Sequence, residues 1–381
     1  MRFIHTADWH LGKLFGQRHM TEDQAYVLDE LIRLVKDTRA EALIIAGDVY
    51  DRAVPPPEAV GLFSETLSKL VEQGSKVLFI AGNHDSAVRL GFGADLFRSS
   101  GVYLTGAVHA ADPPIILSDS FGEVYFSLLP YADPPHMREA FTLTEMPSFD
   151  AAMGVQVQAA RAQIPSGVRS VAVAHAFVIG GQSSESERPL SVGGSDQVSA
   201  HHFSSYSYTA LGHLHAPQRA GAEQIRYSGS LLKYSFDEAA QKKGAVLVEL
   251  DAQGMSSHTF YPLTPRHNVR IVRGRMDELL MDGFDPAPHD DYVCVELLDK
   301  EAVLAAHEKL RQIYPNLVSI TRPHMYIGQL SAETRTYEQG KSDLHLFSDF
   351  YTAMTSESLT DEQERELICI IDALEREERN A

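Results

Sequence analysis

The sequence has few cysteines, no long apolar run and no long basic run, and each absence excludes a class of protein. Only two cysteines occur among 381 residues, Cys294 and Cys369, and they form no CxxC pair. This excludes a cysteine-rich zinc site and is typical of a reducing cytoplasm. No run of about 18 apolar residues could span a membrane, and the first residues enter a strand without a signal-peptide segment. We therefore expect a cytoplasmic protein with no membrane association.

The charge balance is strongly acidic. Asp and Glu number 52 against 33 Lys and Arg, the net charge is −19 at pH 7, and no basic run is longer than Lys242-Lys243. Because neutralisation of phosphates supplies most of the affinity of proteins that bind DNA unaided, this balance argues against tight, independent DNA binding. It does not argue against DNA as a substrate that metal ions and a partner present to the chain.

Length and breaks in composition predict several domains. A chain of 381 residues with 44% apolar side chains is long enough for two or three domains with their own cores. A break follows Pro262 and Pro265. The predicted parts are a main domain over 1–262, a small α/β unit over 266–326, a linker over 327–341 and a helix-loop-helix over 342–381.

The first 80 residues predict a parallel α/β arrangement. Strands are expected over 1–8, 42–45 and 77–80, with an amphipathic helix in each gap. The first helix is predicted to begin at a capping box of Thr21 and Gln24. The second opens after three prolines and stops at Gly74. This β-α-β-α-β order indicates right-handed crossovers between parallel strands.

Residues of metal-ligand type follow five predicted strands, the three given above and two more over 171–174 and 208–212. Taken singly, each has an ordinary explanation: Asp48 fits a turn or helix cap, and His175 fits a packed core histidine. Their joint occurrence, each after an apolar strand, favours a single site at the carboxyl ends of the strands. Next to it we expect a polar loop over 180–199. The candidate site residues are Asp8, His10, Asp48, Asn83, His84, Asp85, His175, His213 and His215.

This set of side chains suits a pair of divalent ions. Two ions about 3.5–4 Å apart need one shared oxygen ligand, and Asp48 is the carboxylate placed to bridge them. Imidazoles, carboxylates and one amide suit Mn²⁺, Fe or Zn²⁺ better than Mg²⁺, which prefers shells made of oxygen alone. Such a pair acidifies a bridging water and neutralises charge on a phosphoryl group.

The motifs resemble those of the calcineurin-like metallophosphoesterases. They are Asp8-Trp9-His10, Gly47-Asp48-Val49-Tyr50-Asp51, Gly82-Asn83-His84-Asp85, His175 and Gly212-His213-Leu214-His215. The start Asp8-x-His10-Leu11-Gly12 and the two accessory regions are similar to the DNA-repair nuclease branch of this family. The resemblance implies an α/β fold: a layered β-sandwich flanked by helices, with a small α/β accessory domain that contributes to DNA binding and a C-terminal helical hairpin.

The resemblance also implies roles for the site residues. The catalytic histidine would be His84, which is a proton donor or charge stabiliser rather than a ligand, with Asp85 orienting it. Relatives from archaea and eukaryotes have a second histidine where this chain has Asp51, so the resemblance implies no second-histidine role here. Metal one would be held by Asp8, His10, Asp48 and His215. Metal two would be held by Asp48, Asn83, His175 and His213.

For the whole protein, the resemblance implies a Mn²⁺-dependent nuclease of DNA repair and recombination. It would act as a 3′→5′ exonuclease on duplex ends and as an endonuclease on single strands and hairpins. Its partners would be DNA, a second copy of itself and an SMC-like ATPase, two of each subunit forming a heterotetramer that is nucleoid-associated when bound to DNA. The tail over 342–381 would grip the coiled coil of the ATPase, through Phe347, Phe350, Tyr351 and Met354 on one helix and Leu367, Ile370, Ile371 and Leu374 on the other.

Three alternatives stay open. An enzyme of the same fold could act on small phosphoesters or cyclic nucleotides, although such an enzyme has no need of the accessory regions. A nuclease-inactive scaffold could hold the ATPase dimer, although a scaffold would not require Asp48, His84 and His215 together. The tail could instead be a hairpin folded onto its own domain.

Overall fold

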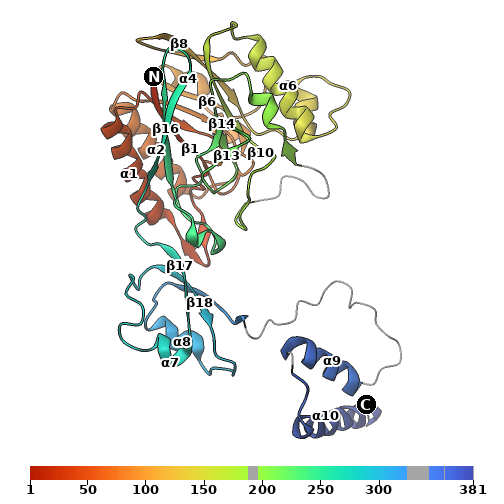
Figure 1. Cartoon of the computed structure of the whole chain (residues 1–381). Coiled ribbons are helices and arrows are strands. Elements are labelled where there is room, and N and C mark those ends of the chain that lie inside the picture. The colour runs from red at the N-terminus through yellow and green to blue at the C-terminus, as the bar shows by residue number, and fades with distance from the viewer. Residues whose placement is uncertain (188–195, 324–342, 356, 381) are drawn as a thin grey trace. The chain divides into compact units, whose positions relative to one another are not determined.

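The computed structural model describes residues 1–187, 196–323, 343–355 and 357–380. It divides into two compact units, Met1–Val269 and Arg270–Ala381. Every predicted site residue lies in the first unit, which appears in red to green in Figure 1. The predicted linker over 327–341 lies outside the described residues. In the described part of the chain, no helix is long and apolar enough to cross a membrane.

The first sheet of this unit has six strands in the order β16-β15-β1-β4-β5-β6. Strands β1, β4, β5 and β6 run parallel, which confirms the predicted arrangement of the first strands, and β15 and β16 continue the sheet antiparallel. The bounds are β1 Arg2–Thr6, β4 Ala42–Ile45, β5 Lys76–Ile80, β6 Val102–Thr105, β15 Gly244–Leu250 and β16 Met255–Pro262.

The second sheet also has six strands, in the order β13-β14-β12-β9-β8-β7. Its four central strands are parallel and its two edge strands antiparallel. The bounds are β7 Ile115–Asp119, β8 Gly122–Leu129, β9 Arg169–His175, β12 Tyr208–Gly212, β13 Gln218–Ala220 and β14 Ala222–Tyr227. Two short pairs lie outside the large sheets: β2 Leu14–Phe15 with β3 Arg18–His19, and β10 Phe177–Val178 with β11 Gln197–Val198.

The two sheets pack face to face on one apolar core. Phe3 and Leu78 of the first sheet belong to the same buried cluster as Phe126 and Tyr208 of the second. At the end of the sandwich that carries the site, the sheets approach closely, because a Cβ atom on Gly212 would lie 1.9 Å from the carbonyl oxygen of Ala46. Only glycine fits there, so loops from both sheets can share one site.

Helices cover the outer faces, and the layered α/β sandwich predicted from the sequence is confirmed. Helix α1 does not form the predicted capping box: its N-cap is Met20, and the Gln24 side chain bonds to Gly12 and His10 instead. Gly74 does follow the end of α2, with φ of 82°. The helices of this unit are α1 Thr21–Thr38, α2 Pro57–Glu72, α3 Ala87–Leu90, α4 Ala94–Arg98, α5 Pro134–Ala140, α6 Phe149–Ala162, η1 Ala200–Phe203 and η2 Asp237–Ala240.

The second unit begins with a three-stranded sheet in the order β17-β18-β19. Its core includes Val293, Leu310 and Tyr314. Two short helices, α7 and α8, accompany these three strands. The bounds are β17 Val269–Gly274, α7 Met276–Leu279, β18 Tyr292–Leu297, α8 Ala306–Arg311 and β19 Leu317–Thr321, followed by α9 Asp343–Thr355 and α10 Asp361–Asn380.

Candidate metal centre

Five strand ends carry the predicted site residues to one edge of the sandwich. Strands β1, β4 and β5 of the first sheet run into the loops of Asp8, Asp48 and Asn83. In the second sheet, β9 ends at His175 and β12 ends just before His213. Open α/β folds place ligands beyond the carboxyl ends of parallel strands, and this edge gathers ligand-type side chains from both sheets.

Four of these residues have left-handed backbone conformations. The φ angles are 53° for Asp8, 45° for His10, 50° for Asp48 and 103° for His213. Each such conformation costs about 1–3 kcal/mol in a residue other than glycine and persists only where the surroundings enforce it. Main-chain hydrogen bonds do so here: Asp8 donates to Gly47 O at 3.1 Å, and His10 donates to Asp48 O at 3.0 Å. The loops after β1 and β4 therefore form one rigid platform.

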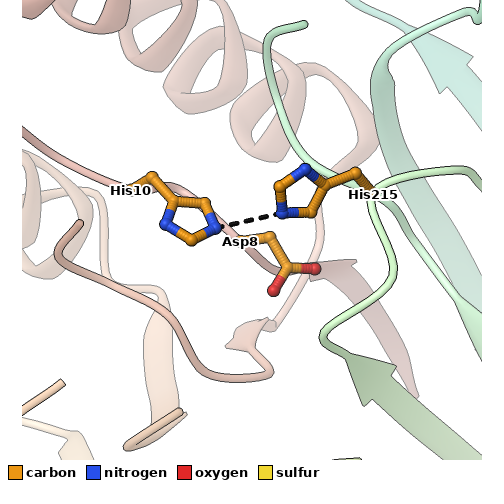
Figure 2. Close-up of side chains that lie close together, drawn as sticks. All are labelled: Asp8, His10 and His215. Carbon is orange, nitrogen blue, oxygen red and sulfur yellow. Dashed lines mark hydrogen bonds between the residues drawn. The ribbon is translucent and has the colours of Figure 1, made fainter. Parts of the chain in front are cut away.

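One group of ligand atoms consists of Asp8, His10 and His215, all buried (Figure 2). Nε2 of His10 and Nε2 of His215 point toward each other and lie 3.1 Å apart, with the Asp8 carboxylate beside them. The Asp8 carboxylate also accepts hydrogen bonds from the main-chain N–H of His213, at 2.9 and 3.2 Å. Residues from the first and last motifs of the unit are thus brought together.

A second group lies around Asn83. Its Oδ1 atom is 2.9 Å from Nε2 of His175 and 3.3 Å from Nδ1 of His213. The other ring nitrogen of His175 bonds to the carbonyl oxygen of Ala46 at 2.9 Å. Because that carbonyl can only accept, we assign the hydrogen of the neutral His175 ring to Nδ1. Nε2 and Asn83 Oδ1 then face each other as two acceptors, an arrangement that suits a shared cation.

Asp48 lies between the two groups. Its Oδ2 atom is 3.7 Å from Nε2 of His10 in the first group and 3.5 Å from Nε2 of His175 in the second. It is also 4.0 Å from Nε2 of His84, and the main chain of His84 donates to the other carboxylate oxygen at 2.9 Å. One carboxylate therefore reaches both sets of imidazoles.

The electrostatics of the site suit a cation. Burial lowers the pKa of His10 to about 3 and also lowers the pKa values of His175, His213 and His215, so these rings are neutral at pH 7 and offer lone pairs. Burial and the neighbouring charge of Asp48 raise the pKa of Asp8 well above its usual range. A divalent cation would hold both carboxylates ionised and would accept the facing lone pairs, so the donor set fits metal ions.

His84 has a different orienting partner from the one predicted. Its Nδ1 donates to the main-chain carbonyl of Asp51 at 2.8 Å. Asp85 instead accepts main-chain N–H bonds from Gly82, Val49 and Tyr50 at 2.9 to 3.1 Å. The pKa of Asp85 is raised to about 7 by burial and by Asp48. Its role here is to fix the turns after β4 and β5, and the predicted orientation of His84 by Asp85 is wrong.

Comparisons with known proteins decide the family. Residues 1–136 match the family model described as calcineurin-like phosphoesterase, and residues 265–355 match the model described as Type 5 capsule protein repressor C-terminal domain. The crystal structure of TT1561 of Thermus thermophilus aligns with 68% of this chain and 98% of its own, at 13% identity and a TM-score of 0.39. The SbcD subunit of the SbcCD nuclease of Staphylococcus epidermidis is 30% identical over 364 residues, which cover 95% of this chain and 96% of the relative. The chain belongs to the SbcD family.

As a member of the SbcD family with a calcineurin-like phosphoesterase domain, this chain is a metal-dependent phosphoesterase. Asp51 is the position at which the sequence departs from the pattern of its archaeal and eukaryotic relatives. The Asp51 carboxylate forms a 2.9 Å ion pair with Lys13 and lies 3.6 Å from Nδ1 of His10. In this SbcD-family chain Asp51 thus stands behind a candidate ligand.

Several residues around the centre were missed from the sequence. Gln24 and Tyr234 hold the main-chain carbonyl of Trp9, next to His10. Ser186, from the loop predicted over 180–199, and Glu238, from η2, face His215; residues 188–195 of that loop lie outside the described residues. Gln24 gave only the signal of a helix cap, and Ser186 and Glu238, in segments without apolar periodicity, gave no signal of a buried role.

Proposed function

We propose that this chain is a two-metal nuclease that hydrolyses DNA phosphodiester bonds. The observation that supports it most is the position of Asp48, whose Oδ2 lies within 3.7 Å of an imidazole from each group. Two ions bridged by one carboxylate would acidify a water and neutralise charge on the phosphoryl group in an in-line displacement. The relative named above is itself a nuclease.

The proposed ligand sets follow the two groups of side chains. Asp48 belongs to both sets. The mixture of imidazole, carboxylate and amide donors favours Mn²⁺ over Mg²⁺. Metal one would be held by Asp8, His10, Asp48 and His215, and metal two by Asp48, Asn83, His175 and His213.

His84 is proposed to act on the leaving group. Its Nδ1–H is occupied by the Asp51 carbonyl, so Nε2 is the atom that can exchange a proton with the leaving oxygen. This ring nitrogen lies beside the candidate bridge, 4.0 Å from Asp48 Oδ2. General acid catalysis of this kind contributes roughly 10²–10⁴-fold to a rate.

The test of this function is cleavage by the purified full chain, stripped of metal and then supplied or not supplied with Mn²⁺. The substrates are hairpin DNA and a generic phosphodiester, bis(p-nitrophenyl) phosphate. We expect Mn²⁺-dependent cleavage of both. If the chain cleaves the generic ester but does not cleave the hairpin DNA, the small-phosphoester enzyme is favoured. If the metal-loaded chain cleaves neither substrate, the inactive scaffold is favoured.

We propose SbcC, the SMC-like ATPase of the SbcCD complex named in the relative's description, as the partner. With a net charge of −19, the chain needs a partner to supply basic DNA-binding surface. In this proposal 266–326 is an accessory DNA-binding domain, and the tail over 342–381 binds the coiled coil of SbcC. ATP-dependent 3′→5′ processing of duplex ends would require the complex of two chains of each kind, whereas cleavage of single strands would not.

The surface of α3 and α4 is the proposed homodimer contact. Val88, Phe92 and Leu96 are 81%, 78% and 76% exposed. Three large apolar side chains so exposed within nine residues are typical of a protein interface. Phe92→Asp should shift the full chain from dimer to monomer in light scattering, and Leu304→Asp, at an exposed leucine of the second unit, should not. A dimer that survives Phe92→Asp, Leu96→Asp would place the contact elsewhere.

A further inference from the structure

A buried charged cluster lies behind His215, on the side away from the other candidate ligands. Glu238 is fully buried, and its Oε2 forms a 2.6 Å ion pair with the buried Lys243. Its Oε1 lies 3.3 Å from Nδ1 of His215 and accepts the hydroxyl hydrogen of Ser186. Ser186 Oγ in turn lies 2.6 Å from Nδ1 of His215.

Counting hydrogens fixes the tautomer of His215. The Ser186 hydroxyl has one hydrogen, and an ionised carboxylate can only accept, so that hydrogen points to Glu238. Ser186 Oγ must therefore accept from Nδ1–H of His215. The lone pair is then on Nε2, the atom that faces Nε2 of His10 at 3.1 Å. The hydrogen bonds from His215 to Ser186 and from Ser186 to Glu238 thus leave the Nε2 lone pair of His215 facing the metal-one group.

The same cluster fixes the main chain of His215. Lys243 Nζ donates to the carbonyl oxygen of His215 at 2.7 Å, and the main-chain N–H of His215 donates to Glu187 Oε1 at 2.5 Å. Contacts from two separate segments, 186–187 and 238–243, therefore hold both the side chain and the main chain of His215. Such a concentration of buried charge calls for an explanation beyond packing, because a buried ion pair adds little stability by itself.

In the metal-two group, the imidazole of His175 is supported by an uncharged main-chain carbonyl instead of a carboxylate. Nδ1 of His175 donates to the carbonyl of Ala46 at 2.9 Å. A carboxylate behind a ligating imidazole increases its basicity and fixes its orientation, and loss of such a support typically costs about 10–100-fold in metal affinity. The two halves of the centre therefore differ in what polarises their imidazoles.

We propose that Glu238, acting through Ser186, is a positioning residue that fixes the Nδ1–H tautomer of His215 and so sets the affinity of the metal-one half for a divalent cation. This inference rests on the proposed assignment of His215 to metal one. It assigns Lys243 the task of pairing with the Glu238 carboxylate within the protein interior.

The test measures Mn²⁺ binding by calorimetry to the metal-free full chain. Ser186→Ala removes the relay without changing charge, and the double variant Glu238→Gln, Lys243→Met removes the carboxylate without leaving a buried charge. Each should weaken one of the two Mn²⁺ sites by about 10-fold or more and leave the other unchanged. Asp119→Asn is the matched control, since Asp119 is also buried and paired with a cation, Arg169, but away from this centre; it should leave both affinities unchanged.

A second readout separates positioning from general stability. Selective ¹⁵N-histidine NMR of the metal-free chain should show His215 as the Nδ1–H tautomer, and Ser186→Ala should convert it to a mixture. Unchanged affinity in both variants, or a wild-type His215 tautomer in Ser186→Ala, would overturn the inference. His215→Ala tests the ligand assignment separately from the role of Glu238. If this variant keeps both ions at full affinity, the proposed ligand set is wrong, and the proposed role of Glu238 is wrong with it.

Discussion

The metal centre and the C-terminal tail use their side chains in opposite ways. In the first unit Asp8, His10 and Asp48 are buried and bonded within the unit. On the tail, Phe347 of α9 and Ile370 of α10, two residues of the predicted apolar seams, are 43% and 53% exposed. The candidate ligands are therefore held within the first unit, whereas the tail exposes apolar side chains. This difference indicates that hydrolysis and assembly can be broken separately.

Asp48→Ala should break the centre and leave the tail intact. It removes the carboxylate whose Oδ2 lies within 3.7 Å of an imidazole of each group, so both ions should bind poorly and activity should fall by several orders of magnitude. Mn²⁺-dependent hairpin cleavage and metal content measure the loss, and gel filtration with SbcC should show undiminished association. The control is Asp37→Ala on the exposed side of α1. Near-normal cleavage by Asp48→Ala would mean that the bridge is misassigned.

His84→Gln should separate chemistry from metal binding within the centre. If His84 acts on the leaving group, turnover should fall by roughly 10²–10⁴-fold while both ions and DNA affinity are kept. Metal analysis decides the role, because His84 Nε2 lies within reach of the ligand atoms of His10 and Asp48. Loss of an ion from His84→Gln would make this residue a ligand.

Deletion of residues 342–381 should break assembly and leave the centre intact. The truncated chain should keep Mn²⁺-dependent cleavage of single-stranded DNA but lose association with SbcC and ATP-stimulated processing of duplex ends. Gel filtration of the truncated chain with SbcC tests this, and undiminished complex formation would reduce the tail to a structural hairpin.

A single substitution sharpens the assignment of the tail. Phe347→Ala should weaken SbcC binding by about 30-fold, the equivalent of roughly 2 kcal/mol for an aromatic anchor. The side chains of Phe350, Met354 and Leu374, which belong to the same predicted seams, lie outside the described residues. Thr352→Ala, at an exposed position of α9, is the matched control and should bind SbcC normally.

The sequence predicted the strand ends and the ligand-type side chains that follow them because both signals are local. An apolar run such as Ala42–Ile45 followed by Gly47-Asp48 needs no knowledge of distant residues. Two pairs of residues with the capping pattern show where this reasoning ends. Thr360 and Gln363 form reciprocal capping hydrogen bonds at the start of α10. Gln24 has an equivalent pattern but is taken by the loop of His10, a contact from outside its helix.

The residues behind the ligands could not be predicted for the same reason. Glu238 and Lys243 belong to a polar segment that looks exposed in sequence, yet in the folded unit they are buried, and Lys243 donates to the main chain of His215. The orienting partner of His84 was wrong because it is a main-chain oxygen, that of Asp51, which leaves no mark on residue type. Contacts between distant segments, and contacts with the main chain, are set by the folded unit.

The smallest predicted effect concerns His5, which is buried between the two sheets of the first unit. Its two ring nitrogens bond to Tyr208 Oη at 3.0 Å and to the carbonyl of Leu211 at 3.1 Å, and burial lowers its pKa from 6.5 to about 3. Between these two values the unfolded chain binds a proton that the folded chain does not. The contribution of His5 to stability is therefore fully present above pH 6.5 and is lost as the pH falls, at about 1.4 kcal/mol per pH unit.

His5→Gln should remove this term, so that unfolding by urea in chelator, compared at pH 7.5 and 5.5, should show about 1.4 kcal/mol less acid destabilisation than the unaltered chain. His345→Gln, at an exposed position of α9, should leave the pH dependence unchanged. Equal acid sensitivity of His5→Gln and the unaltered chain would show that His5 takes up its proton within the folded unit.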